Sequence, residues 1–322
     1  MRRLSPRPTW RARRAAVGLV SVLVAACERP EPVPGRKDTT IPVVPLPEST
    51  VALPAPASAW DSAAGPALFI VGPTPFEAAV ILPAYTDSAS LDSTPLDAAL
   101  LRTVKVDLFA GGKRAGAASI TAVTSLAHSD SCTSWPNAKL LPTVADSTVF
   151  QSWSVAFQAG QAAEIALDSI ESLPSADSSR LAADIARLAS ALPGDTAALF
   201  RGLPFVVKKA WRTRGLAPQA LAAIIVRNVN QEANPRQEQI VLIAERDTTV
   251  ASSRYAPVYQ ERTTGLEETI EATDLIGMVL LGRDQRPTIV IARDSFGGSS
   301  YALLERISGV WKLRWASAYA GC

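Results

Sequence analysis

Residues 125–131 are the part of the sequence where a nucleophile, a base and an acid lie closest together. This heptapeptide contains three serine hydroxyls, the imidazole of His128 and the carboxylate of Asp130, which are the components of a serine-hydrolase triad. In known triads the side chains come from separate elements, because sequence neighbours cannot all face one centre. No Gly-x-Ser-x-Gly or Ser-x-x-Lys motif supplies a nucleophile elsewhere. We therefore interpret the segment as a polar loop that leads into Cys132.

Acidic residues offer a second type of chemistry, because paired carboxylates can act as general acid and base in the hydrolysis of glycosidic bonds. The sequence contains three such groups, which are Asp168/Glu171, Asp177/Asp184 and Glu267/Glu268/Glu271. The residues around them are mostly Ala, Ser and Thr, which is typical of solvated surfaces. We assign no catalytic residue among them.

The chain contains one histidine, which excludes any metal site built from two or more imidazoles. It has no P-loop, no dinucleotide-binding glycine motif after a strand and no Cys-x-x-Cys. We therefore predict neither a metal nor a cofactor. Five tryptophans could form a platform for a sugar, and they are Trp135, Trp153, Trp211, Trp311 and Trp315. For the last two, strand alternation favours the core instead.

The elements that position these residues are mostly strands. Short apolar runs bounded by turn residues occur at 68–71, 79–82, 104–109 and 118–123. Gly111-Gly112 lies between the third and fourth runs, a pattern that predicts a β-hairpin. Later runs at 221–227 and 239–245 also have the composition of strands.

One helix is predicted, at about residues 176–192. Leu181, Ile185, Leu188 and Leu192 follow each other at spacings of four, three and four on a polar background, which places them on one helical face. Ser175 is available as the N-terminal cap, and Pro193-Gly194 ends the pattern.

Four strands follow one another at the C-terminus, at 276–281, 288–293, 301–307 and 310–316, with short polar links. Short links imply antiparallel neighbours, so we expect a C-terminal antiparallel meander. In the last strand Trp311, Leu313 and Trp315 alternate with Lys312 and Arg314, which predicts one core face and one wet face. The predicted fold class is strand-rich α+β, with antiparallel sheets and one clear amphipathic helix.

The segment 281–311 resembles one unit of the FG-GAP type of propeller repeat. It has a polar turn, a β-hairpin and an aromatic-Gly-Gly-Ser-Ser-Tyr stretch at 296–301. The family's aspartate-rich calcium loop is replaced by residues 282–287, with one carboxylate and two guanidinium groups, which are poor ligands for calcium. A propeller needs at least about four blades, and no other unit is found.

The N-terminus carries an export signal. Positions 1–26 contain six arginines and no acidic residue, and an apolar run of about 12 residues covers 15–26. This run has the length of a signal-peptide core and is shorter than the roughly 20 residues of a spanning helix. It ends in Val24-Ala25-Ala26-Cys27, which resembles the lipobox of bacterial lipoproteins.

The lipobox resemblance implies that Cys27 is diacylated, with chains such as palmitate, and becomes the new N-terminus. Two acyl chains hold a domain on a membrane without a spanning helix. Glu28 follows the cysteine, where some Gram-negative lipoproteins carry an inner-membrane retention Asp. We therefore expect an exported, lipid-anchored protein that faces the periplasm or the outside, in the outer membrane more than in the inner.

Cys132 and Cys322 remain once Cys27 is acylated, an even pair in an oxidising compartment. We expect a disulfide between them, with two free thiols, or a reactive thiol at the terminus, as the alternative. This disulfide would close a loop of about 190 residues. In the chain-entropy model such a loop closure stabilises the folded state by roughly 5 kcal/mol.

A proline-rich tether separates the anchor from the folded part. Residues 28–58 contain eight prolines, which favour extended chain. We divide the chain into a signal peptide at 1–26, lipidated cysteine and tether at 27–59, and a globular domain at 60–322, with a subdivision near 170 as the alternative. Without 1–26 the chain has 26 basic and 30 acidic residues, a balance that does not favour nucleic-acid binding.

The sequence thus predicts a lipid-anchored cell-envelope protein with a binding or structural role that is not enzymatic. Its contact with the membrane is through the acyl chains on Cys27, and its protein or glycan partner is not identified. The alternative is an envelope hydrolase that uses a carboxylate pair on a glycan or a similar polymer.

Overall fold

The computed structural model describes residues 60–125, 127–128, 132–143, 149–193, 198–230, 234–295 and 297–322. It confirms the predicted strand-rich α+β class, with 51% strand, 16% helix and antiparallel sheets. The described residues belong to one compact unit. The lipobox and the tether up to residue 59 lie outside the described residues. Among the helices described, none is long and apolar enough to cross a membrane.

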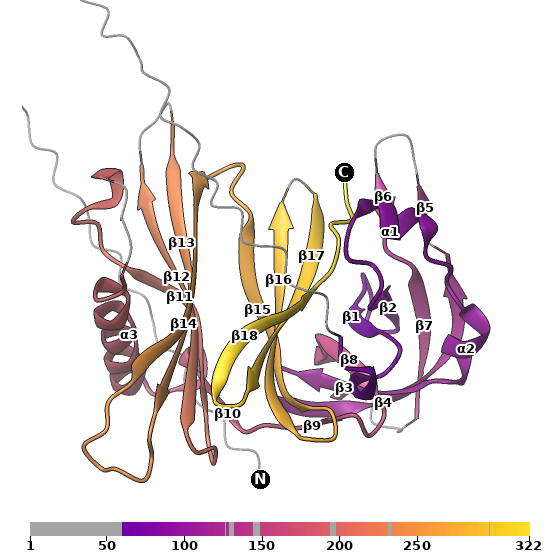
Figure 1. Cartoon of the computed structure of the whole chain (residues 1–322), viewed down its shortest axis with the longest axis horizontal. Coiled ribbons are helices and arrows are strands. Elements are labelled where there is room, and N and C mark those ends of the chain that lie inside the picture. Colours follow the sequence, from indigo (N-terminus) through magenta and orange to yellow (C-terminus); the bar gives the residue numbers. More distant parts are fainter. Residues whose placement is uncertain are drawn as a thin grey trace, which may run out of the picture. The chain divides into compact units, whose positions relative to one another are not determined.

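The N-terminal part of the unit contains a closed antiparallel barrel (Figure 1). Its strands, in order around the barrel, are β1 (Leu68–Val71), β2 (Glu77–Ile81), β7 (Asn137–Pro142), β4 (Lys113–Thr124), β3 (Lys105–Ala110) and β8 (Val155–Gln158). The hairpin predicted at Gly111-Gly112 joins β3 to β4, and Gly111 has φ of 61°, which glycine adopts at no steric cost. Buried side chains such as Phe69, Leu108 and Trp153 fill the interior, so the barrel is a packed core.

Short elements surround the barrel. They are η1 (Ser62–Ala64), α1 (Ser88–Ser93), α2 (Ala98–Thr103), η2 (Val149–Ser152) and the small ladder of β5 (Ala127–His128) with β6 (Thr133–Ser134). Leu101 of α2 belongs to the barrel core. Asp97 caps this helix, because its carboxylate accepts from the backbone N–H of Leu100 at 2.8 Å.

The predicted C-terminal meander forms a second sheet. It contains β18 (Val310–Ala316), β17 (Gly298–Ile307), β16 (Arg286–Ser295), β15 (Ala272–Leu281) and β9 (Ala162–Ala163), in that order. The hairpin of β16 and β17 lies in the segment that resembles a propeller repeat, but it belongs to a five-stranded sheet, whereas a propeller blade has four strands.

A third sheet contains β10 (Leu167–Ser169), β11 (Val206–Thr213), β12 (Gln219–Val229), β13 (Arg236–Arg246) and β14 (Ala256–Leu266). Two short 3₁₀ helices, η3 (Ile170–Ser172) and η4 (Ala198–Phe200), and the helix α3 (Ser175–Ser190) lie around it. α3 packs on this sheet through Leu181, Ile185 and Leu188.

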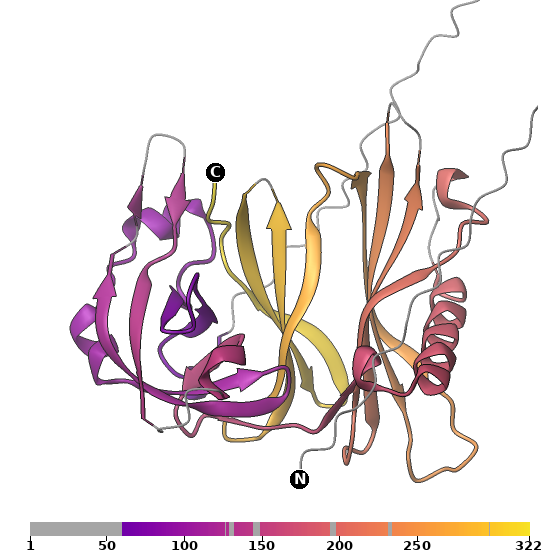
Figure 2. The same cartoon turned by 180° about the vertical axis from the view of Figure 1, so that it is seen from behind.

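Hydrophobic clusters show how these parts are stacked, and both ribbon views agree (Figures 1 and 2). The outer face of the barrel packs on the meander, for example through Phe157 and Leu303. The other face of the meander packs on the third sheet, as at Leu304 and Ile243. The order is therefore barrel, meander, third sheet and α3. Both inner sheets are covered on two faces, which explains why β12 and β13 read as continuous apolar runs.

The start of α3 differs from its prediction. The helix covers Ser175–Ser190, close to the predicted 176–192, but its N-terminal cap is Pro174, without a side-chain cap hydrogen bond. Ser175 is the first helical residue and is not the cap. Proline lacks a hydrogen-bonding side chain, so packing of the apolar face stabilises this helix more than capping does.

The predicted alternation of the last strand is interrupted by a β-bulge at Arg314. Leu304 pairs with Leu313, while the preceding Leu303 pairs with Trp315, so one residue is extra on β18. As a result Leu313 packs toward the third sheet, while Trp315 packs toward the barrel. The prediction that Trp311, Leu313 and Trp315 share one face was therefore wrong for Trp315. Trp311 and Trp315 are both core residues, as expected.

Candidate functional site

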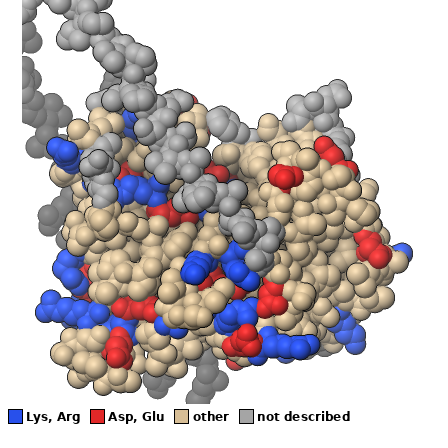
Figure 3. All heavy atoms as spheres, viewed as in Figure 1, with Lys and Arg blue, Asp and Glu red and all other residues tan. Residues whose placement is uncertain are grey.

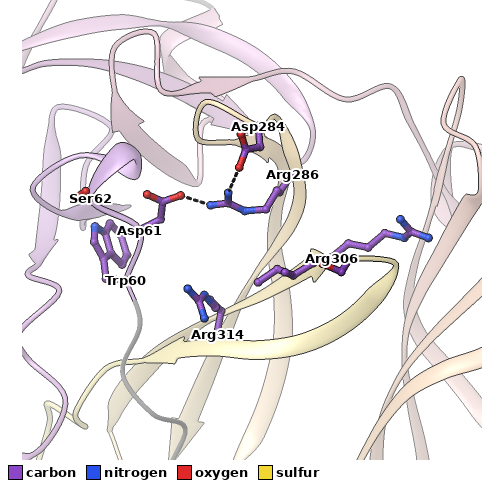
Figure 4. A pocket seen from close by; sticks show the side chains of 9 residues that line it. Trp60, Asp61, Ser62, Asp284, Arg286, Arg306 and Arg314 are labelled. Carbon is purple, nitrogen blue, oxygen red and sulfur yellow. Dashed lines mark hydrogen bonds and ion pairs between the residues drawn. The ribbon is translucent and has the colours of Figure 1, made fainter.

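A hollow of about 550 Å³ lies where the described chain begins (Figure 4). Its lining residues come from the start of the domain, the β15–β16 turn and the β17–β18 hairpin. They are Trp60, Asp61, Ser62, Asp284, Arg286, Arg306, Ile307, Ser308 and Arg314. Segments that are far apart in the sequence thus meet here. The view of Figure 3 shows acidic and basic side chains mixed over the two sheets, without a field of one sign on that face.

Arg286 organises the charges of this hollow by binding three carboxylates. Its guanidinium donates to Asp61, to Asp284 at 2.9 Å and to Glu305 at 3.2 Å. Glu305 is almost completely buried, whereas the side chain of Asp284 is 77% exposed. The Asp61 and Glu305 contacts therefore stabilise the site more than the exposed one does.

The same contacts set the protonation of the acids. The hydrogen bond from Arg286, together with the backbone N–H of Ala63, holds the pKa of Asp61 below its usual range. Burial raises the pKa of Glu305, and Arg286 partly opposes that rise. Asp61 therefore stays ionised at neutral pH and is a poor general acid.

Arg306 lines the hollow with its stem, but its guanidinium points away from it (Figure 4). That group donates to Glu245 of β13 at 2.6 and 3.2 Å, and the indole N–H of Trp311 donates to the same carboxylate at 2.6 Å. This contact links the meander to the third sheet. Arg306 is consequently occupied in holding two layers together.

Arg314 is the guanidinium that points into the hollow, between Trp60 and Arg286 (Figure 4). It is the extra residue of the bulge in β18, and bulges redirect side chains. Its Nε is buried and has no hydrogen-bond partner among the described residues. Trp60 forms the opposite wall and is held by its N–H donating to Gly65 at 2.9 Å and by edge-on packing against Trp315.

The predicted carboxylate groups do not come together in this hollow. Asp168 binds Arg212 at 2.7 Å and Arg214 at 3.2 Å. Asp177 and Asp184 lie on α3 and make exposed contacts with Arg180 and Arg187. Glu171 lies in η3 and lines a separate hollow beside Lys209 and Asp274. Glu267 follows β14 and its backbone N–H donates to Pro235.

A second hollow, of about 480 Å³, contains one member of the third carboxylate group. It is lined by Glu268, Ile270, Asp294, Ser295, Gly297, Gly298 and Ser299. Partial desolvation raises the pKa of Asp294, with a smaller contribution from Asp274, although the residue remains exposed. Burial also raises the pKa of Glu271, which lies 3.7 Å from the guanidinium of Arg293.

The predicted disulfide is confirmed. Cys132 and Cys322 are bonded, with their Cα atoms 4.2 Å apart. The backbone N–H of Thr133 donates to the carbonyl of Gly321 at 2.9 Å, beside the bridge. His128 is the last residue of β5, while its side chain and residues 129–131 lie outside the described part, so the loop interpretation stays a prediction.

The tryptophans do not form a platform. Trp153, Trp211, Trp311 and Trp315 are buried, and Trp135 is half-buried against Tyr85 and Tyr301. Within the described ranges no group of His, Cys, Asp and Glu is placed to hold a metal ion. Comparison of the chain with protein-family models, curated proteins and solved structures finds no match.

Sequence reasoning missed the residues that build the first hollow. The predicted domain boundary at residue 60 assigns no role to Trp60, and the alternation of the last strand places Arg314 on a wet face. For Arg286 the sequence indicates only that its guanidinium is a poor ligand for calcium. The one usable signal is the density of charge in the β15–β16 turn, where two arginines flank Asp284 within four residues.

Proposed function

We propose that the protein is exported, is anchored to the outer membrane through acyl chains on Cys27, and acts there by binding or structural support. The observation that carries the proposal is the Cys132–Cys322 disulfide. Disulfides persist in oxidising compartments such as the periplasm. The bond therefore supports the export that the N-terminal signal predicts.

The charges of the first hollow favour binding over catalysis. Asp61 and Asp284 are held by Arg286, and acid–base catalysis requires a carboxyl that exchanges a proton near the working pH. A hollow whose acids are fixed by ion pairs is better suited to hold a ligand than to transform it.

Membrane fractionation tests the anchor. Cys27→Ser should move the protein from the membrane pellet to the soluble fraction, because the acyl chains supply its membrane affinity. The double variant Cys132→Ser/Cys322→Ser is the matched control and should still pellet. Pelleting of Cys27→Ser with the mass of a chain that carries no lipid would reject the proposal.

The second hollow favours one rival, a hydrolase that uses Glu268 and Asp294 on a glycan. Its specific support is that Asp294, whose pKa is raised by partial desolvation, lines the same hollow as Glu268; a carboxyl with a raised pKa suits a general acid. Purified peptidoglycan sacculi are the probe. A hydrolase should release fragments from them, and Asp294→Asn should stop the release while Asp284→Asn should not. Equal release by the wild type and Asp294→Asn would exclude this role.

A further inference from the structure

We infer that the first hollow binds a carboxylate group attached to an apolar or aromatic body, and that Arg314 holds that carboxylate. The inference deepens the proposed binding role and rests on it. Its starting point is the lining residue Arg314, whose guanidinium points into the hollow without a described hydrogen-bond partner at Nε.

An unpaired guanidinium N–H that is shielded from water is unfavourable, because it loses its hydration and gains no hydrogen bond in return. The buried Nε of Arg314 is in this state. The other two arginines of the lining are occupied, Arg286 by three carboxylates and Arg306 by Glu245. Arg314 is therefore the lining guanidinium best able to donate hydrogen bonds to an oxygen atom of a ligand.

The walls around Arg314 are already ordered. Trp60 is fixed by its hydrogen bond to Gly65 and by Trp315, with ring centroids 5.1 Å apart. Asp61 is fixed by Arg286 and by the backbone N–H of Ala63 at 2.8 Å. A ligand would order few side chains on entering, which favours affinity.

The surrounding charges select the type of anion. A guanidinium matches the planar carboxylate with two parallel hydrogen bonds. Asp61 and Glu305 lie close enough to Arg314 for its positive charge to lower their pKa values. They would repel a doubly charged phosphate more than a singly charged carboxylate. The indole of Trp60 offers the ligand an apolar surface for its body.

Two sources could supply this chemistry, a free aromatic acid and the C-terminus of a peptide. Isothermal titration of the full-length protein in a non-ionic detergent distinguishes them. The small probes are 3-phenylpropionate, its neutral amide and phenyl phosphate. The peptide probes are acetyl-Ala-Ala-Phe with a free and with an amidated C-terminus.

The wild type should bind 3-phenylpropionate or the free-acid peptide, and should bind the matching amide and phenyl phosphate at least about tenfold more weakly. Binding of the peptide alone would identify a chain terminus as the source. Equal binding of acid and amide, or no heat from any probe up to about 10 mM, would overturn the inference.

Variants assign the binding to Arg314. Arg314→Gln should weaken it about tenfold or more, while Arg254→Gln, an exposed arginine on the loop between β13 and β14, should leave it unchanged. If Arg314→Gln does not fold, Ser62→Trp reduces the space and keeps the charge, and it should weaken binding as well. Unchanged affinity in the folded variants would overturn the assignment. Membrane fractionation tests the lipid anchor, and titration tests ligand binding in the first hollow. The proposed function and this inference can therefore fail independently of each other.

Discussion

Single ion pairs connect the layers of this protein at the residue scale. Glu245 accepts from Arg306 and Trp311, and Glu261 accepts from Arg293 at 2.8 Å, so two carboxylates of the third sheet bind side chains of the meander. Both carboxylates are nearly buried. Removal of one partner from such a pair leaves an uncompensated charge, which destabilises a fold more than the pair itself stabilises it.

Asp61→Asn should lower the free energy of unfolding by about 1–2 kcal/mol at pH 7, because a charge-assisted hydrogen bond to Arg286 is lost. The pKa of Asp61 is lowered in the fold, so its contribution is present above its unfolded pKa of about 3.9. This stabilising contribution is lost as the pH falls through the pKa of Asp61 in the folded state. Urea unfolding at pH 7 and pH 2.5 should show a smaller difference between variant and wild type at the lower pH.

The exposed Asp284 provides the control for that measurement. Asp284→Asn removes a charge from the same arginine, but at a solvated position, and should change the stability by less than about 0.5 kcal/mol. An effect of Asp61→Asn that is equal at both pH values would contradict the assigned role of its ionised form.

At the scale of elements, the meander and the third sheet are each buried on both faces. Each of their strands must therefore present apolar side chains to two hydrophobic cores. The bulge at Arg314 shows how this is achieved in β18, because it directs Leu313 to one core and Trp315 to the other. α3, in contrast, packs on one face of the third sheet through a single apolar stripe.

Ile185→Ala in α3 should lower the free energy of unfolding by about 2–4 kcal/mol. Ile185 is fully buried between the helix and the sheet, and deletion of its side chain leaves a cavity. The neighbouring Asp184→Ala, on the exposed face, should cost less than about 0.5 kcal/mol. Denaturant melts of both variants measure the difference, and equal losses would mean that this face of α3 is not packed as described.

At the scale of the whole molecule, the disulfide links the barrel part of the chain to the segment that follows the meander. Cys132 lies between β5 and β6, the small ladder beside the barrel, and Cys322 lies after β18 of the meander, with a separation of 190 residues. Terminal segments tend to fray unless they are held. The bond therefore keeps the C-terminal segment against the barrel part.

Reduction of the disulfide should lower the free energy of unfolding by about 2–4 kcal/mol, because the unfolded chain gains the entropy that the long closure removes. The double variant Cys132→Ser/Cys322→Ser should match the reduced wild type and should not respond to reductant. Melts with and without dithiothreitol test this, together with peptide mapping of the unreduced protein. An unfolding midpoint of the wild type that stays the same after complete reduction would contradict the stabilising role of the disulfide.

Local patterns in the sequence determined the element types and much of their order. Short polar links between successive apolar runs predicted the meander, the glycine pair predicted the β3–β4 hairpin, and the spacing of Leu181, Ile185 and Leu188 predicted α3. These signals succeed because strand and helix periods are properties of neighbouring residues. The even number of cysteines left after Cys27 predicted the disulfide in the same way, from composition and compartment.

Only the tertiary structure decided which core each face joins and where the hollow forms. Residues 68–158 contain no local sign that six strands close into a barrel, and the sequence pattern places Arg314 on a solvent-facing side until the bulge in β18 turns it toward Trp60. Asp61 and Arg286 are 225 positions apart in the chain. Contacts over such distances depend on how whole sheets stack, and that stacking follows from the combined burial of many side chains, which no local pattern specifies.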